Sequence, residues 1–537
     1  MPRVRIPALV TICCVVSLGA QPILAQDPAR VRLDLERADL AGTVPLSLEE
    51  TVRIAMERNP ALFVERLRVE QAEVGIDEAT GAWEPVFDAS GQVARRDNVV
   101  ASRFFPTGVY VEEDSIYQAR LNGLTKVGST YGVDLRYQRQ ISNSNTQSLS
   151  PQFSANLNFT YSQPLMRDFG SDVTETPLRI AQREHEMSEA NLSLTLSTMV
   201  FDVVQAYWNL VFVREDLEVK RQSLTFAEQL LEQNETLFDA GEVAAVNVHE
   251  ARAAMFERQE QVIVAESLVG EADDRLKVLM YADLDNVNVI PRDELADGGM
   301  VVDLPASYSS AMAGRPEVVR LEREIEQRIH ETDFASNQAK PRLDLNLQYG
   351  LSGLSGLPNT TLVNPESPTL GTAGDTVAGS VFAGITRPLG AFDRFFKGDG
   401  FDSWSVELRF EMPLWNTSAK ARVSNAQLRQ QESEVNLTQT REAIRLQIRD
   451  AARGVDTARQ SVAAARAAIA AVDEQLSAAR LRFDAGLASS YELLLVQDDL
   501  ANAMTRELQA LMTHNVAEAA LLLADSRILP EYGIEVQ

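Results

Sequence analysis

The sequence predicts an α+β membrane protein that is internally duplicated. A trimeric outer-membrane β-barrel, with about four strands from each copy and possibly an extra hairpin, is continued by a long antiparallel coiled-coil α-helical barrel in the periplasm. Three observations predict this class. Landmarks recur about 250 residues apart, apolar residues follow a heptad pattern over long segments, and shorter segments alternate between apolar and polar residues.

The N-terminal segment, residues 1–25, has the organisation of a secretory signal peptide. Two arginines precede an apolar run over residues 6–20, and a small-residue cleavage site ends at Ala25. The run is too short to span a bilayer, which argues against a membrane anchor. Both cysteines, Cys13 and Cys14, lie inside this segment. The mature chain is therefore expected to use neither disulfides nor thiol chemistry.

The formal net charge is −27, and removal of the two arginines in residues 1–25 leaves −29. This balance argues against a nucleic-acid partner, because phosphates need a basic face. It is compatible with an interior that favours cations. Beyond residue 25 no uninterrupted run reaches the ~18 apolar residues of a membrane helix. A membrane crossing must then use a β-barrel.

Four landmarks recur in the same order in both halves of the chain, which predicts an internal duplication. They are Pro60 with Pro316, Pro85 with Pro341, Pro164 with Pro413, and Gly241 with Gly486. Each half consists of a short helix, a β region, a very long helix, a glycine turn and a medium helix. The predicted divisions are a first repeat over 26–284, a linker over 285–306, a second repeat over 307–529 and a tail over 530–537.

Coiled-coil helices are predicted wherever apolar residues alternate steps of three and four. An unbroken seam runs from Ile448 to Phe483, and the equivalent seam from Val203 to Phe238 is broken only at Lys220 and Asn234. The medium helices have seams interrupted at Arg258, Glu507 and His514.

Helix lengths predict how the rods fit together. The helix over about 175–238 is ~96 Å long, whereas its partner over 245–281 is only ~55 Å long. The short helix over 60–82 adds ~34 Å, so the short and medium helices together match the long one. In the second half, the helices over 316–338 and 489–526 together match the length of the helix over 418–484.

Four segments have the apolar and polar alternation of outer-membrane strands: 86–93, 152–163, 342–349 and 404–412. A soluble sheet with one face on a core is the alternative. A further alternating pair, 116–124 and 130–138, is interpreted as an extension of the extracellular region, with insertion into the barrel as the other possibility. The glycine-rich stretch 350–402 is expected to be a long outer loop.

Four strands cannot close a barrel, since about eight is the lower limit. An open edge in lipid leaves backbone groups unpaired, at several kcal/mol each. Three copies would supply twelve strands. No histidine has metal-ligand spacing, and no nucleotide or hydrolase motif occurs. No cofactor and no enzymatic activity are expected.

Several motifs resemble the TolC-like outer-membrane efflux proteins. They are LSLEETVRIAMERNPAL (46–62), QPLMRDFG (163–170), AYWNLVFVREDLEV (206–219) and the two FDAG sequences at the helix turns. The resemblance implies a homotrimer in the outer membrane of a Gram-negative bacterium, with a twelve-stranded barrel and a tunnel through the periplasm. It implies a passive exit duct for a tripartite efflux pump or type I secretion system. The implied partners are a periplasmic adaptor, an inner-membrane transporter and outer-membrane lipid.

The resemblance also implies site residues at the turns. The expected adaptor contacts are Phe238, Asp239, Gly241, Glu242 and Val243 in the first half, and Phe483, Asp484, Gly486 and Leu487 in the second. The alternative is that the glycines only turn the chain. Asp473, Glu474 and Asp484 are candidates for a charged periplasmic gate, with a solvated helix face as the alternative. A periplasmic coiled-coil scaffold or adaptor is the alternative function.

Overall fold

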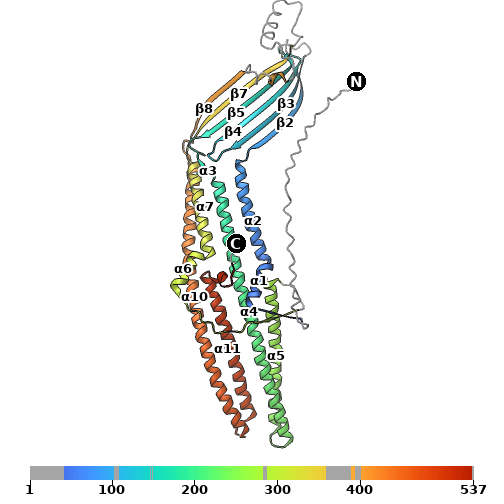
Figure 1. Cartoon of the computed structure of the whole chain (residues 1–537), viewed down its shortest axis with the longest axis vertical. Coiled ribbons are helices and arrows are strands. Elements are labelled where there is room, and N and C mark those ends of the chain that lie inside the picture. The colour runs from blue at the N-terminus through green and yellow to red at the C-terminus, as the bar shows by residue number, and fades with distance from the viewer. Residues whose placement is uncertain are drawn as a thin grey trace, which may run out of the picture.

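The computed structural model describes residues 42–101, 108–144, 147, 149–281, 287–358, 389–392, 401–485 and 487–534. The expected signal peptide lies outside these residues. Figure 1 shows an elongated molecule with a sheet at one end and two helical hairpins at the other. The C-terminal end of the chain lies part-way along the helical region.

The sheet has six strands in the order β2-β3-β4-β5-β7-β8, and every neighbouring pair is antiparallel. Strands that follow one another in sequence lie side by side, so the sheet is an up-and-down meander (Figure 1). The strands are β2 Val86–Val99, β3 Val109–Leu124, β4 Thr130–Ser142, β5 Leu149–Pro164, β7 Arg342–Pro358 and β8 Phe401–Glu411.

Two expectations about the sheet need correction. The pair interpreted as an extension of the extracellular region forms β3 and β4, which lie within the sheet between β2 and β5. Insertion among the other strands, the possibility that the sequence left open, is the one found, so the sheet of one copy has the four expected strands and the extra hairpin. The outer loop expected over 350–402 is also shorter, because β7 continues to Pro358. Residues 359–388 and 393–400 of that loop lie outside the described residues.

Helix starts follow recognisable capping signals. The α1 helix, Leu48–Arg58, begins at a capping box in which Ser47 Oγ accepts from Glu50 N at 3.2 Å and Ser47 N donates to Glu50 Oε2 at 3.1 Å. Proline opens both α2, Pro60–Thr80, and α7, Pro316–Gln338. This position suits proline because its missing N–H has no partner in the first turn anyway.

The long and medium helices agree with the predicted ranges to within two residues. They are α4 Thr176–Asp239, α5 Ala245–Met280, α10 Thr417–Asp484 and α11 Ser490–Ala524. In Figure 1, α2 and α5 lie one after the other along α4, and α7 and α11 lie likewise along α10. The predicted end-to-end arrangement is confirmed. Because α4 also packs against α7 and α11, the two halves form one helical wall.

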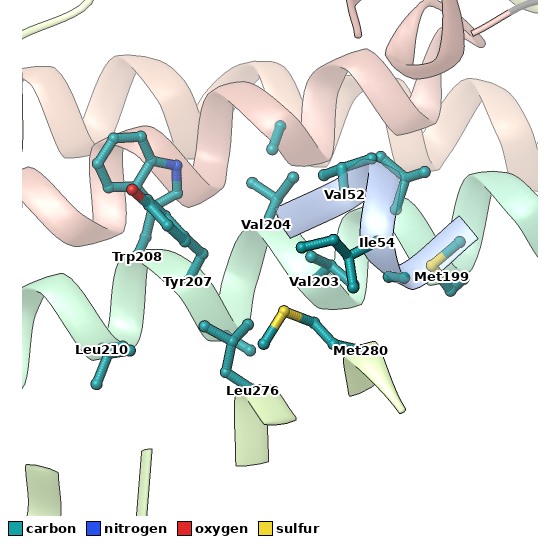
Figure 2. Close-up of a cluster of buried hydrophobic side chains, with 14 of the residues drawn as sticks. Val52, Ile54, Met199, Val203, Val204, Tyr207, Trp208, Leu210, Leu276 and Met280 are labelled. Atoms are coloured by element: carbon teal, nitrogen blue, oxygen red, sulfur yellow. The ribbon is translucent and has the colours of Figure 1, made fainter. Parts of the chain in front are cut away.

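The largest hydrophobic core among the described residues lies where α1 and the C-terminal end of α5 meet the middle of α4 (Figure 2). Val52 and Ile54 of α1 pack with Val203 of α4 and Leu276 of α5. Among the described residues, α4 is the one helix with a window long and apolar enough to cross a membrane, at a mean hydropathy of 1.3. Since 61% of that window is buried, we interpret α4 as a core helix.

Two short strands and the residues that follow them form a belt beside the helices at the level of this core. A parallel pair joins β1, Thr43–Leu46, to β6, Asn288–Pro291. The buried hydroxyl of Tyr207 lies 3.0 Å from Leu46 O and 2.8 Å from Asp293 Oδ2, and it accepts from Arg292 N at 3.2 Å. Burial raises the pKa of Tyr207 well above its usual range. One α4 side chain thus joins the end of β1 to the residues that follow β6.

Candidate functional site at the hairpin ends

The α4–α5 hairpin turns at a glycine in the left-handed region. Gly241 has φ +79°, and its N–H donates to Phe238 O at 2.9 Å while Glu242 N donates to Leu237 O at 2.8 Å. These two bonds make a Schellman motif, which caps the last carbonyls of α4. The glycine therefore has a sufficient structural reason to be there.

The α10–α11 hairpin turns in a similar way. Leu487 N donates to Arg482 O at 2.8 Å, the same six-residue bond as in the first hairpin. Ser489 then caps α11, because its Oγ accepts from Glu492 N at 3.2 Å. Gly486 lies outside the described residues, as does the side chain of Asp484.

Both hairpin ends present an apolar side chain to solvent. Phe238 is 45% exposed and Leu487 is 73% exposed, and the acidic residues Asp239 and Glu242 are exposed at the same hairpin end as Phe238. The other two expected contact residues, Val243 and Phe483, are half-buried. An exposed apolar side chain at a helix turn is available for contact with another protein.

Two of the three expected gate residues, Asp473 and Glu474, are exposed on α10. Asp473 lines a cleft of about 380 Å³ between the two hairpins, together with Phe226 of α4, Arg480 of α10 and Glu507 of α11. The Arg480 guanidinium lies over the Phe226 ring at 5.6 Å, a cation–π contact that joins α10 to α4.

One buried arginine links the hairpins directly. Arg258 of α5 is 5% exposed, and it donates to Ser223 Oγ of α4 at 3.0 Å and to Leu494 O of α11 at 3.2 Å. Among the described residues no carboxylate lies within ion-pair distance of it. The guanidinium thus depends on neutral acceptors, one of which belongs to the opposite hairpin.

Further polar contacts cross between α4 and α11. Asn234 Oδ1 accepts from Ser490 Oγ at 3.0 Å near the hairpin ends. Further from the hairpin ends, Thr505 Oγ1 donates to Asp216 Oδ1 at 2.5 Å, and Lys220 Nζ approaches the same hydroxyl at 3.5 Å. Sequence reasoning did not assign a role to these residues. The available signal was that Lys220, Asn234 and Arg258 each interrupt an apolar seam.

Comparison with known proteins decides the family. The family of outer membrane efflux proteins matches residues 51–280 and 307–525, which is most of the chain. The chain belongs to the outer membrane efflux protein family. This family consists of channels and not of enzymes, and its two matched segments lie in the two halves of the chain in which the landmarks recur.

Relatives of known structure share the fold of this outer membrane efflux protein at low sequence identity. The Campylobacter jejuni outer membrane channel CmeC is 18% identical, with 90% of this chain and 86% of that chain covered and a TM-score of 0.59. The open-state channel MtrE of Neisseria gonorrhoeae is 16% identical, with 90% and 89% covered and a TM-score of 0.60. The outer membrane efflux protein BepC of Brucella suis is 23% identical over 439 residues, 80% of this chain and 83% of BepC.

The efflux protein is accordingly a transport protein of the outer membrane, where it serves as an exit duct. It is located in the outer membrane and has a periplasmic extension. The hairpin ends described above lie at the end of the molecule remote from the sheet (Figure 1).

Proposed function

We propose that three copies of this chain form one closed channel that conducts substrate passively out of the periplasm, as the exit duct of a tripartite efflux pump or type I secretion system. An inner-membrane transporter and a periplasmic adaptor would supply substrate and energy. The family membership and the named efflux relative support this assignment.

The open edges of the sheet are the observation that carries the proposal. Among the described residues, β2 pairs with β3 alone and β8 pairs with β7 alone. The β8 edge is exposed and rich in large apolar residues, with Trp404 at 74% and Leu408 at 65% exposure. Unpaired backbone groups cost several kcal/mol each in lipid. Pairing of β8 with β2 of the next copy would remove both edges, whereas a periplasmic scaffold needs no apolar outer face.

The helices also carry apolar residues that one copy leaves uncovered. Phe63, Leu67 and Val74 form an exposed stripe on α2, and Leu428 and Val435 form another on α10. In Figure 1, α2 and α10 lie at opposite sides of the helical wall. Contact between α2 of one copy and α10 of the next would cover both stripes and continue the barrel contact into the periplasm.

The hairpin ends are proposed as the gate and as the adaptor contact. Closed hairpins would be held together by the contacts of Arg258, Asn234 and Thr505, and an adaptor would bias them outward. Asp473, Glu474 and Asp484 stay candidates for the charged constriction. The exposed residues Phe238 and Leu487 are suited to apolar contact with the adaptor.

The proposed organisation of the chain follows the same plan. Residues 1–25 would direct export and be removed, 26–284 and 307–529 would be the two repeats, 285–306 would link them, and 530–537 would be the tail. The family match to 51–280 and 307–525 supports this division. The linker packs on α11, where Asn515 Nδ2 donates to Ala296 O at 3.0 Å.

Two measurements test the proposal. Purified protein should migrate as a trimer that resists detergent, because closure of the sheet is stable only in the assembly. A monodisperse monomer would overturn the proposed channel. In planar bilayers the wild-type trimer should conduct weakly, and Asp473→Asn should raise the conductance if Asp473 holds the gate closed. Equal conductance would remove Asp473 from the gate while leaving the channel itself in place.

A further inference from the structure

We propose that β3 and β4 are wall strands of the membrane barrel, so that three copies build a barrel of eighteen strands from six in each copy. This inference rests on the proposed trimer. It departs from the twelve-stranded barrel that the family resemblance implies. The difference lies in one hairpin, Val109–Ser142, which is inserted between β2 and β5.

Strand pairing places the hairpin at the same membrane depth as its neighbours. Residues 152–162 of β5 pair with β4 on one side, and residues 152–164 pair with β7 on the other. Every residue of β2 from Val86 to Val99 pairs with β3. A hairpin that projected beyond the membrane could not be hydrogen-bonded along the same residues that bond the other strands.

A row of apolar side chains crosses the whole sheet without a break. Residues directly opposite in neighbouring antiparallel strands point to the same face. One such row contains Phe87, Leu121, Val133, Phe159, Tyr349 and Trp404, one residue from each strand. The hairpin supplies Leu121 and Val133 to this row. At this level the apolar face is therefore continuous from β2 to β8, as a lipid-facing band must be.

The adjacent row has the opposite character from β3 to β8, although its β2 member is Val86. It contains Asn122, Gly132, Thr160, Gln348 and Ser405. Two carboxylates of the hairpin on this polar face have partners on neighbouring strands: Asp134 accepts from Arg120 Nε at 2.8 Å, and Asp114 accepts from Gln138 Nε2 at 3.0 Å and from Arg96 at 3.2 Å. A hydrated bore accommodates such groups, whereas lipid does not.

Strand length agrees with a membrane crossing. The β3 strand has 16 residues and β4 has 13, whereas a tilted membrane strand needs about 9–11. Because barrel diameter grows roughly in proportion to strand number, eighteen strands give about 1.5 times the width of twelve at the same tilt. The duct would then accept bulkier solutes at the level of the outer membrane, and the hairpin ends would set the size limit.

Single-cysteine labelling can test which face of the hairpin meets lipid. The only cysteines in the chain are Cys13 and Cys14, in the expected signal peptide. A spin label would be placed at Leu121→Cys or Asn122→Cys on β3, and at the reference pair Leu347→Cys or Gln348→Cys on β7. All four positions are exposed, so burial does not separate them. Trimers in lipid vesicles are then probed by collision with oxygen, which concentrates in lipid, and with a water-soluble nickel chelate.

The expected result is a reversal of the oxygen-to-nickel collision ratio between the two members of each pair. Oxygen should dominate at residues 121 and 347, and nickel at 122 and 348. If the β7 pair alternates but both β3 labels meet nickel, or both are shielded, the hairpin lies outside lipid and the inference is wrong. If the β7 pair does not alternate either, the proposed membrane channel fails.

Direct imaging of the unmodified trimer in lipid nanodiscs gives a second, independent result. A count of eighteen strands around the bore supports the inference, and a count of twelve overturns it. This measurement needs no substitution, so it decides the question even if a cysteine variant fails to assemble.

Discussion

Replacement of Arg258 by methionine should open the channel without weakening the fold. The side chain is buried and donates to neutral acceptors, and among the described residues Leu494 O is its acceptor on the opposite hairpin. Methionine keeps most of the volume and removes the cost of burying a charge. The backbone carbonyl of Leu494 lies within α11, so loss of the guanidinium leaves it a partner in its own helix.

The expected size of the effect follows from this one contact. A hydrogen bond from a charged donor contributes about 1.5–3 kcal/mol. If it is present only when the hairpins are together, its loss shifts each copy towards the open state by about ten- to 150-fold, at about 1.4 kcal/mol per factor of ten. Planar-bilayer recordings should therefore show a clear rise in open time and mean conductance.

A matched variant separates gating from general damage. Arg221→Met makes the same substitution on the same hairpin, but Arg221 bonds Glu218 and Glu266, both within the α4–α5 hairpin, at 3.0 Å. Both ion pairs are exposed and lie within one hairpin, so their loss should leave conductance unchanged. If Arg258→Met conducts like the wild type, or if Arg221→Met opens the channel equally, the role of Arg258 as a link is refuted.

Three other substitutions have defined expectations. Tyr207→Phe should lower the stability of the trimer to heat by about 1.5–3 kcal/mol, because it removes a hydrogen bond to the Asp293 carboxylate; Tyr308→Phe, at an exposed contact with Arg449, is the control. Since burial raises the pKa of Tyr207 above that of the unfolded chain, the wild type should also lose stability as pH rises above 10, and the variant should lack that component. Gly241→Ala should cost about 1–2 kcal/mol at φ +79°, whereas Gly75→Ala in α2 should stabilise the helix slightly, as followed by thermal denaturation. Phe63→Asp should reduce the yield of trimer on native gels by adding a charge to the α2 stripe, and an unchanged yield would exclude that stripe from the interface.

The helices were predictable because heptad repetition reports the buried face of a long helix. The range expected for the longest rod of the first half, 175–238, differs by one residue at each end from Thr176–Asp239. What the repetition does not report is which helix lies opposite. Lys220, Asn234 and Arg258 therefore looked like mere interruptions, although the structure shows each of them in contact with the second half of the chain.

The sheet was predicted strand by strand but not as a whole. Alternation in 130–138, where Tyr131, Val133, Leu135 and Tyr137 share one face, was visible in the sequence. Its place between the other strands could not be decided from the sequence, because alternation fixes the face of a residue and not the neighbour of its strand. The register that joins Val133 to Phe159 is a long-range property of the sheet.

The meander topology has a consequence for how such ducts can change calibre. An inserted hairpin adds one ascending and one descending strand, so β5 still returns to the periplasmic side and enters α4 as before. Because every copy of the chain carries the same hairpin, the circumference of a symmetric barrel grows by two strands per copy. The helices keep their number and lengths, so the width of the barrel can change without altering the hairpin ends that would bind a pump.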